Sequence, residues 1–309
     1  MENQHANAPW LIAAWPGMGN VAISAGYYLM AKLGMHLVAE FPAREFFDLE
    51  RVDVKDGLIH TGRLPRSRLF MWSDPRKKHD LIVFIGEAQP PSKGGAFCSQ
   101  LIRHAKQIGV QRVFTFAAMA TQMRPEHDSR VFAAAIDKHT LHDFRHLGMH
   151  ILEEGQISGL NGVLLGIAAE AGMDGGCLLG EIPHVFSQFP FPKASLAVLN
   201  IFASMAGISL DLKELEEQGH QVEAGLEELL HRLEKSVASQ TETPAEAEET
   251  EQEETGSRTS TRDKQRIEEL FSVARTDRSQ AYKLKQELDR LKIFHDYEDR
   301  FLDLFKEPG

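Results

Sequence analysis

The chain contains very little cysteine: Cys98 and Cys177 are the only two among 309 residues, and neither lies in a Cys-x-x-Cys pair. This excludes a disulfide framework or a thiolate zinc site and is typical of buried thiols in a reducing compartment. The sequence also lacks the run of about 18 apolar residues of a membrane-spanning helix. Its first ten residues, MENQHANAPW, lack the basic start and apolar centre of a secretory signal. We therefore expect a cytoplasmic protein with no membrane partner.

The chain also lacks an excess of positive charge, because 45 Asp and Glu outnumber 34 Lys and Arg and give a net charge of −11. An acidic protein of this kind is not expected to bind nucleic acid. The one dense histidine group, within 139–150, matches no His-Glu-x-x-His pattern, so we interpret it as a solvated face and assign no metal site. The chain has no serine nucleophile elbow, no evident triad and no phosphate loop, so we assign neither catalytic residues nor a cofactor.

What the chain does have is an alternation of apolar strands and helices with turn residues between them. Strands are expected at 10–15, 36–41, 80–85 and 112–117, and helices at 21–33 and 94–108. Such alternation predicts a three-layer α/β/α core with a mostly parallel sheet.

The most apolar and glycine-rich stretch runs from Gly155 to Pro192. Apolar residues at steps of three and four predict a buried helix, which we expect the pair Gly175 and Gly176 to end. A buried strand from Cys177 to Ile182 follows, with Glu181 near its carboxyl end.

A candidate ligand pocket follows from residues at the carboxyl ends of strands, where open parallel sheets bind ligands. The turn after the first strand supplies Gly17, Gly19 and Asn20, whose backbone N–H groups face the start of a helix. Glu87 and Glu181 would add carboxylates. Two alternatives remain open: the turn is only a tight turn capped by Asn20, and Glu87 only hydrogen-bonds nearby amides. The basic segment 65–79 is interpreted as a solvated loop.

The last third of the sequence predicts an amphipathic helix, a linker and a helical tail. An amphipathic helix with a leucine stripe completes a first domain over 1–237. Residues 238–262 are rich in Glu, Thr, Gln and Ser, which predicts an acidic disordered linker. Residues 263–309 predict a helical tail of one long helix or two, which either docks back on the globular part or binds another chain.

Several of these segments together resemble the proteasome assembly chaperone two family. The matching pieces lie within about 10–235 and are Trp15-Pro-Gly-Met-Gly-Asn-Val-Ala22, Asp80-Leu-Ile-Val-Phe-Ile-Gly-Glu-Ala-Gln-Pro90, Ile157-Ser-Gly-Leu-Asn-Gly-Val-Leu-Leu-Gly166, Leu178-Leu-Gly-Glu-Ile-Pro183 and Pro192-Lys-Ala194. The resemblance implies an α/β/α fold of phosphorylase or hydrolase type, self-association into rings, commonly trimers, and a chaperone or scaffold role. In eukaryotic members that role is the assembly of proteasome α-subunits.

The carboxyl terminus departs from the family pattern. Members that engage the proteasome can do so through a terminal hydrophobic-Tyr-any motif, whereas this chain ends Phe305-Lys-Glu-Pro-Gly309. Pro308 and Gly309 argue against docking through that motif. The expected partners through the tail are proteasome subunits or another protein.

Two functions follow from the sequence. The first is a non-enzymatic assembly chaperone or scaffold that acts by self-association and protein binding. The alternative is a small-molecule enzyme of nucleoside-phosphorylase-like fold, or an ATP-dependent carboxylate–amine ligase, that uses the candidate pocket. We favour the first because no motif supplies a nucleophile or holds a phosphate.

Overall fold

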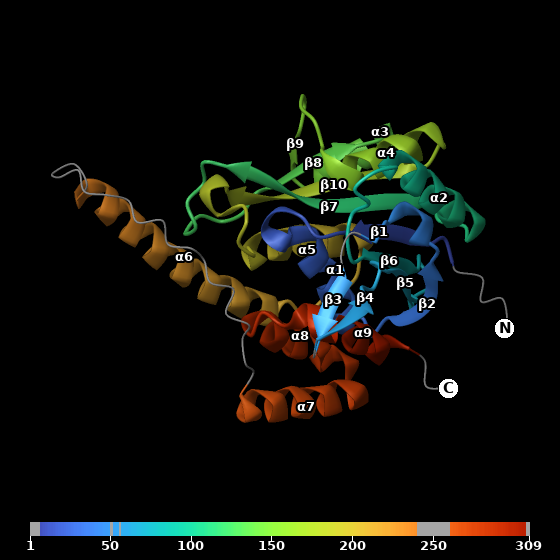
Figure 1. The fold of residues 1–309 in the computed structure, drawn as a ribbon. Helices are drawn as coiled ribbons and strands as arrows, with labels where there is room; N and C mark the ends of the chain where they lie inside the picture. Colours follow the sequence, from blue (N-terminus) through green and yellow to red (C-terminus); the bar gives the residue numbers. More distant parts are fainter. Residues whose placement is uncertain (1–6, 50–51, 56, 240–259, 307–309) are drawn as a thin grey trace.

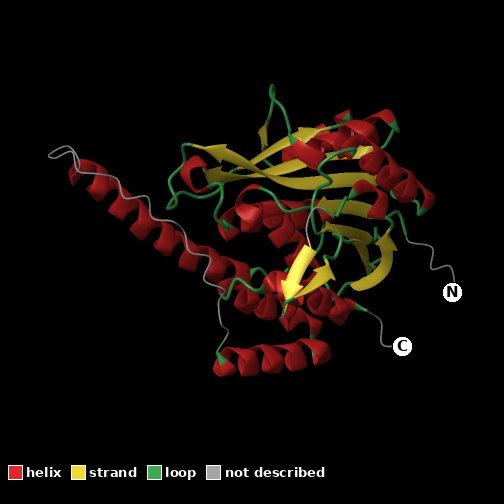
Figure 2. Ribbon diagram, viewed as in Figure 1, coloured by secondary structure: helices red, strands yellow, loops and turns green. Residues whose placement is uncertain are grey.

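The structure is a computed structural model that describes residues 7–49, 52–55, 57–239 and 260–306. It is an α/β protein in which helices cover both faces of one large sheet (Figure 1 and Figure 2). The elements are β1 (Trp10–Ala14), α1 (Val21–Lys32), β2 (His36–Phe41), β3 (Val52–Lys55), β4 (Leu58–Thr61), β5 (Ser67–Trp72), β6 (Leu81–Gly86), α2 (Gly94–Gln107), β7 (Arg112–Thr121), β8 (Val131–Ala135), α3 (Lys138–His146), β9 (His150–Ile151), α4 (Gly159–Glu170), β10 (Asp174–Pro183), α5 (Pro192–Ala206), α6 (Lys213–Ser239), α7 (Thr261–Thr276), α8 (Ala281–Arg290) and α9 (Phe294–Leu302).

The main sheet has the strand order β2-β5-β6-β1-β7-β10-β8-β9. Its central strands β6, β1, β7 and β10 are parallel, while β5 pairs antiparallel with both β6 and β2, and β8 pairs antiparallel with β10. The expected α/β/α fold is confirmed. Because the central strands point the same way, the loops after β1, β6 and β10 meet at one edge of the sheet.

Strand β1 shows how the two faces of the sheet are built. Ile12 and Ala14 pack into the core on the side of α1 and α5, whereas Leu11, Ala13 and Trp15 pack on the side of α2 and α4. Side chains of successive strand residues point to opposite faces, so a strand buried on both sides is apolar throughout. This explains the continuous apolar sequence of β1 and β6.

The glycine-rich stretch forms the expected helix and strand, but the predicted boundary between them is wrong. Helix α4 ends at Glu170, and Gly172 follows it with a φ of +70°. Gly175 and Gly176 lie inside β10 instead. A Cβ at Gly175 would come within 1.9 Å of the carbonyl oxygen of Val113, so these glycines permit close strand pairing rather than ending a helix.

Gly86, the last residue of β6, lies under the ring of Trp15. A Cβ at this position would lie 2.4 Å from atoms Cδ1 and Nε1 of the indole. Trp15 is 1% exposed and packs against Phe84 and Phe97. The indole therefore occupies the space that a side chain at position 86 would need.

The chain beyond α5 consists of one long helix and a compact tail. Helix α6 runs outward until its far end stands clear of the sheet (Figure 1). The tail forms three helices, α7, α8 and α9, rather than the one or two expected. Its side chains share the core on the α1 side of the sheet, where Phe301 packs on Tyr27 and Phe305 on Phe70.

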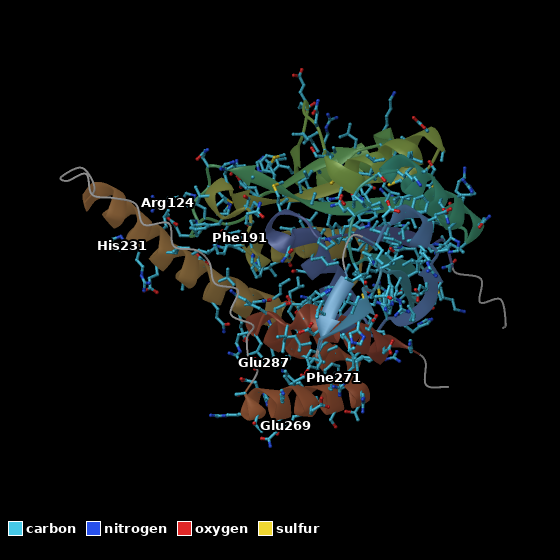
Figure 3. All side chains as sticks on the ribbon, viewed as in Figure 1. Arg124, Phe191, His231, Glu269, Phe271 and Glu287 are labelled. Atoms are coloured by element: carbon cyan, nitrogen blue, oxygen red, sulfur yellow. The ribbon has the colours of Figure 1, made fainter. Side chains whose placement is uncertain are left out.

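Within the tail, α7 is amphipathic, as Figure 3 illustrates. Phe271 faces the other tail helices and is buried under the guanidinium of Arg300, whereas Glu269 is exposed on the other side. Most of the acidic linker expected at 238–262 lies outside the described residues. No helix in the described part of the chain combines the length and apolar character of a membrane span.

Candidate functional site

The loop after β1 holds Gly17, Gly19 and Asn20 in a turn that is tied to the segment after β10. Gly19 and Asn20 adopt left-handed backbone conformations, with φ of +61° and +50°. The Gly19 N–H donates to the carbonyl oxygen of Ser187 (2.9 Å), and the Asn20 N–H donates to that of Gly17 (3.0 Å). The N–H groups of Gly19 and Asn20, which the sequence predicted would face an anion, therefore have acceptors within the chain.

Gln89 is a residue of this edge that the sequence analysis did not single out. Its side-chain Nε2 donates to the carbonyl oxygen of Pro16 (3.1 Å), and its Oε1 accepts from the backbone N–H of Leu160 (3.1 Å). Gln89 thus joins the glycine turn to the first turn of α4, whose free N–H groups need acceptors. Its position in the Gly86-Glu-Ala-Gln-Pro90 segment was the signal for it.

Glu87 lies at the start of the same loop but belongs to an arginine cluster. Its carboxylate accepts from Arg63 Nη1 (2.6 Å), Arg68 Nη1 (2.9 Å) and the backbone N–H of Arg66 (2.9 Å). Arg68 is 1% exposed within β5. The interpretation of segment 65–79 as a solvated loop is therefore wrong for this residue. A charged side chain this deeply buried needs ion-pair and hydrogen-bond partners, because they compensate for its lost hydration.

The tail completes this cluster from the other side. Asp299 forms ion pairs with Arg63, Arg66 and Arg68. Burial opposes its ionisation, but the hydrogen bond from Arg68 and the nearby guanidinium charges hold the pKa of Asp299 below its ordinary value. The neighbouring Glu298 accepts a hydrogen bond from the hydroxyl of Tyr27 (2.8 Å). Burial, followed by the charge of Glu87, raises the pKa of Glu298.

Glu181 lies on β10 in a separate ion pair. Its carboxylate accepts from Arg130 Nε (2.8 Å), Arg130 Nη2 (2.6 Å) and the hydroxyl of Thr121 (2.7 Å). Hydrogen bonds from Arg130 lower its pKa to about 2, against the opposing effect of burial. A carboxylate with this pKa stays ionised near neutral pH, whereas a general acid or base works best with a pKa close to the operating pH.

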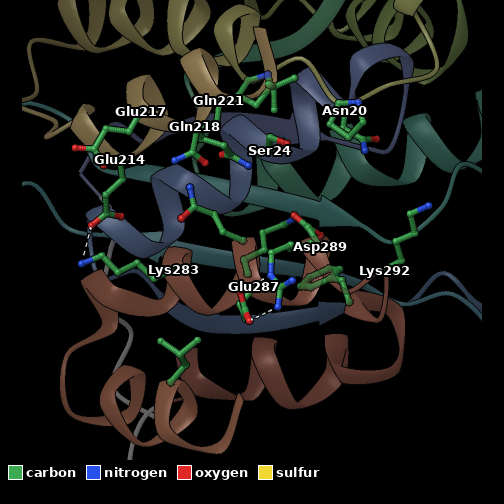
Figure 4. Close-up of a pocket in the computed structure, with 18 of the residues that line it drawn as sticks. Asn20, Ser24, Glu214, Glu217, Gln218, Gln221, Lys283, Glu287, Asp289 and Lys292 are labelled. Carbon is green, nitrogen blue, oxygen red and sulfur yellow. Dashed lines mark hydrogen bonds and ion pairs between the residues drawn. The ribbon is translucent and has the colours of Figure 1, made fainter. Parts of the chain in front are cut away.

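The described residues of the candidate pocket have different surroundings, and the common pocket stays a prediction. Glu181 lines a hollow of about 410 Å³ with Thr121 and Arg130. Asn20 lines a cavity of about 800 Å³ between α1, α6 and α8, where dashed ion pairs join Glu214 to Lys283 and Glu287 to Arg290 (Figure 4). Among the described residues, no three His, Cys, Asp or Glu side chains are grouped so that they could hold a metal ion.

Residues 11–230 match the family model of the PAC2 family. The chain belongs to the PAC2 family. Among curated proteins, MJ1210 of Methanocaldococcus jannaschii is 26% identical over 234 residues, which is 73% of this chain and 83% of MJ1210. The match to the family model ends at residue 230, so α7, α8 and α9 lie outside the family region.

Solved structures of PAC2 relatives share this fold. PbaB of Pyrococcus furiosus, described as an archaeal proteasome activator, is 24% identical with a TM-score of 0.62, over 75% of this chain and 96% of PbaB. Rv2125 of Mycobacterium tuberculosis, described as a proteasome-assembly chaperone homologue, is 21% identical with a TM-score of 0.61, over 71% of this chain and 94% of its own. At these identities the likeness concerns the fold.

The Glu181 ion pair of this PAC2 protein predicts a pH-dependent stability. The carboxyl has a pKa of about 2 in the fold and an ordinary value near 4.3 when unfolded. It therefore stabilises the fold above that ordinary value, and the contribution is lost as pH falls towards 2. The shift corresponds to about 3 kcal/mol, which solvent around the half-exposed Arg130 reduces, so we expect Glu181→Gln to cost about 1–2 kcal/mol at pH 7.

Urea unfolding at a series of pH values checks this. The difference between wild type and Glu181→Gln is expected to shrink as the pH is lowered from 5 to 3. Glu153→Gln is the matched control, because Glu153 is an exposed carboxylate, and it should change stability by less than about 0.5 kcal/mol. A Glu181→Gln difference that stayed constant over this range would contradict the assignment.

Proposed function

We propose that this PAC2 protein is a non-enzymatic assembly chaperone or scaffold that acts in the cytoplasm by self-association, with a trimer as the favoured form, and by binding other proteins. Proteasome subunits are the partner class suggested by the described roles of PbaB and Rv2125. The buried, free thiols of Cys98 and Cys177 accord with a reducing compartment.

The observation that carries the proposal is an exposed apolar patch at the carboxyl ends of the central strands. We call Met18, Val185 and Phe189 the turn patch; their exposed fractions are 48%, 66% and 47%. The glycine turn and the segment after β10 are held together by the Gly19–Ser187 and Phe191–Gly19 backbone hydrogen bonds. Grouped exposed apolar side chains are typical of protein contact surfaces. In an enzyme of this fold the loops after β1 and β10 would bind a ligand, whereas in this protein they expose apolar side chains.

Self-association is tested by size-exclusion chromatography with light scattering. We expect wild type at about three times the chain mass of 34.6 kDa. Burying a Val or Phe side chain is worth about 1.5–3 kcal/mol, so Val185→Asp/Phe189→Asp should weaken association at least 100-fold. Val273→Asp is the control, because Val273 is 47% exposed on α7, away from the patch. A monomeric wild type at micromolar concentration would contradict the proposal.

Partner binding is tested by affinity purification from the native cell with wild type and the Val185→Asp/Phe189→Asp variant. We expect wild type to retain proteasome subunits or other proteins that the variant loses. Recovery of the same proteins with both would mean that the turn patch is not the contact surface.

A further inference from the structure

Strands β3 and β4 form a hairpin that stands apart from the main sheet. They pair antiparallel with each other and with no other strand in the described part of the chain (Figure 1). Val54 lies opposite Ile59, and Val52 lies two residues before Val54, so these three side chains share one face of the hairpin. Their exposed fractions are 50% for Val52, 69% for Val54 and 74% for Ile59. We call these three residues the hairpin patch.

The hairpin is held at its base but not covered on its apolar face. Arg63, two residues after β4, donates to Glu87 (2.6 Å) and forms an ion pair with Asp299 (3.3 Å). A two-stranded hairpin alone is at best marginally stable in water, and it gains stability when an apolar face packs against another element. The hairpin patch is therefore a fixed surface that lacks the packing it needs.

The turn patch is the other group of exposed apolar side chains. Among the described residues outside the turn patch and the segment 49–59, the exposed large apolar side chains are single ones on separate elements: Val38 on β2, Val163 on α4 and Val273 on α7. Single exposed apolar residues are normal on protein surfaces, whereas groups of them mark contact sites. Two groups, the hairpin patch and the turn patch, therefore need a partner surface.

Both patches leave the sheet at the same edge but at different places along it. Phe41, the last residue of β2, pairs with Ser67, the first residue of β5, and Ser67 pairs with Gly86 at the end of β6. The segment that carries the hairpin therefore departs from the edge where the loops after β1 and β10 depart. Strands β6, β1 and β7 lie between β5 and β10, which separates β5 from β10 by about 19 Å. This placement suits copies that lie side by side.

We infer that the two patches are the two halves of one interface, in which the hairpin patch of each copy docks on the turn patch of the next. This inference rests on the self-association proposed above and names the surfaces that meet. A patch that meets its own equivalent closes a dimer, whereas a ring of three requires each copy to offer two different surfaces. The described part of the chain exposes two such apolar patches, and each can cover the other.

Cysteine cross-linking of the full-length chain tests which surfaces meet. Ile59→Cys places a thiol on the hairpin patch and Val185→Cys places one on the turn patch, while both native cysteines are buried. The two variants carry different tags, are co-expressed and are treated with a short bismaleimide. We expect a covalent product at twice the chain mass that carries both tags. Either variant expressed alone should give no such product, because equivalent patches do not meet.

The cross-linking outcomes separate this contact from self-association itself. The doubly substituted chain, Ile59→Cys/Val185→Cys, should give covalent dimers and trimers in denaturing electrophoresis. Cross-linked dimers of either single variant would mean that equivalent patches meet, and they would overturn the inference. An oligomer in light scattering that yields no product with both tags would overturn the inference and leave the proposed function intact. A monomeric wild type would overturn both.

Substitutions on the two faces of the hairpin give a second test. Val54→Asp/Ile59→Asp should weaken association at least 100-fold, because it removes two buried apolar side chains from each contact. Leu58→Asp is the matched control, since Leu58 is 64% exposed on the opposite face of the same hairpin. Size-exclusion chromatography with light scattering should show monomers for the double variant and the wild-type oligomer for the control. Unchanged association of Val54→Asp/Ile59→Asp would overturn the inference.

Discussion

Phe301→Ala is expected to lower the free energy of unfolding by about 3–5 kcal/mol, the usual cost of removing a fully buried phenylalanine side chain. Phe301 is 0% exposed and lies against Tyr27 of α1 and Phe294 and Phe305 of the tail. Because a domain is stabilised by only about 5–15 kcal/mol in total, one tail residue would then account for a large part of it. The melting temperature should fall by roughly 10 °C.

Two probes followed at one fixed protein concentration check this result. Trp10 and Trp72 lie in strands of the sheet and Trp15 directly follows β1. The fluorescence of these three tryptophans therefore reports on the core, while far-UV circular dichroism also reports on the tail helices. We expect the two urea transitions to coincide and to shift together in Phe301→Ala. Val273→Ala, at an exposed position of α7, should shift neither. A tail that melted first, with fluorescence unchanged, would contradict a shared core.

Arg68→Met is expected to cost about 3 kcal/mol. Removing one partner of a buried ion pair costs about 3–5 kcal/mol because the other charge stays buried. Arg68 contacts both Glu87 and Asp299 with only 2% of its side chain exposed. The lower end of the range applies because Arg63 and the backbone N–H of Arg66 still bind Glu87.

The measurement is urea unfolding of Arg68→Met, Arg68→Met/Glu87→Met and Arg145→Met. The double variant should cost no more than the single one, because apolar side chains of similar volume replace a buried ion pair at little cost. Arg145 pairs with Glu153 at the surface, 3.9 Å away, so its substitution should cost less than about 0.5 kcal/mol. A loss below 1 kcal/mol for Arg68→Met would mean that the cluster does not hold the tail and β5 together.

The sequence predicted the elements whose signals are local. Strands β1, β2, β6 and β7 and helices α1 and α2 begin within one residue of their predicted positions, because apolar periodicity and turn residues define them. The family assignment, which rested on the order of several short segments, is confirmed. These features can be predicted without knowing which residues far apart in the sequence contact each other.

What the sequence did not predict depends on distant contacts. Gly175 resembles a helix terminator until the carbonyl of Val113 is known to lie against it. Arg68 resembles a surface residue until Glu87 and Asp299 bind it. Strand β8 (Val131–Ala135) was not predicted, and it is specified by its antiparallel pairing with β10. Likewise, the common pocket of Gly17, Gly19, Asn20, Glu87 and Glu181 stays a prediction: the carboxylates of Glu87 and Glu181 bind different arginines.

The contact between Trp15 and Gly86 has an evolutionary consequence. Because the indole occupies the volume that a Cβ at position 86 would need, the two positions form one steric unit and cannot vary independently. A relative that acquires a larger residue at the last position of its β6 strand must lose the large ring after its β1 strand. Across PAC2 sequences, we therefore expect these two positions to change as a pair, with the size of one inversely related to that of the other.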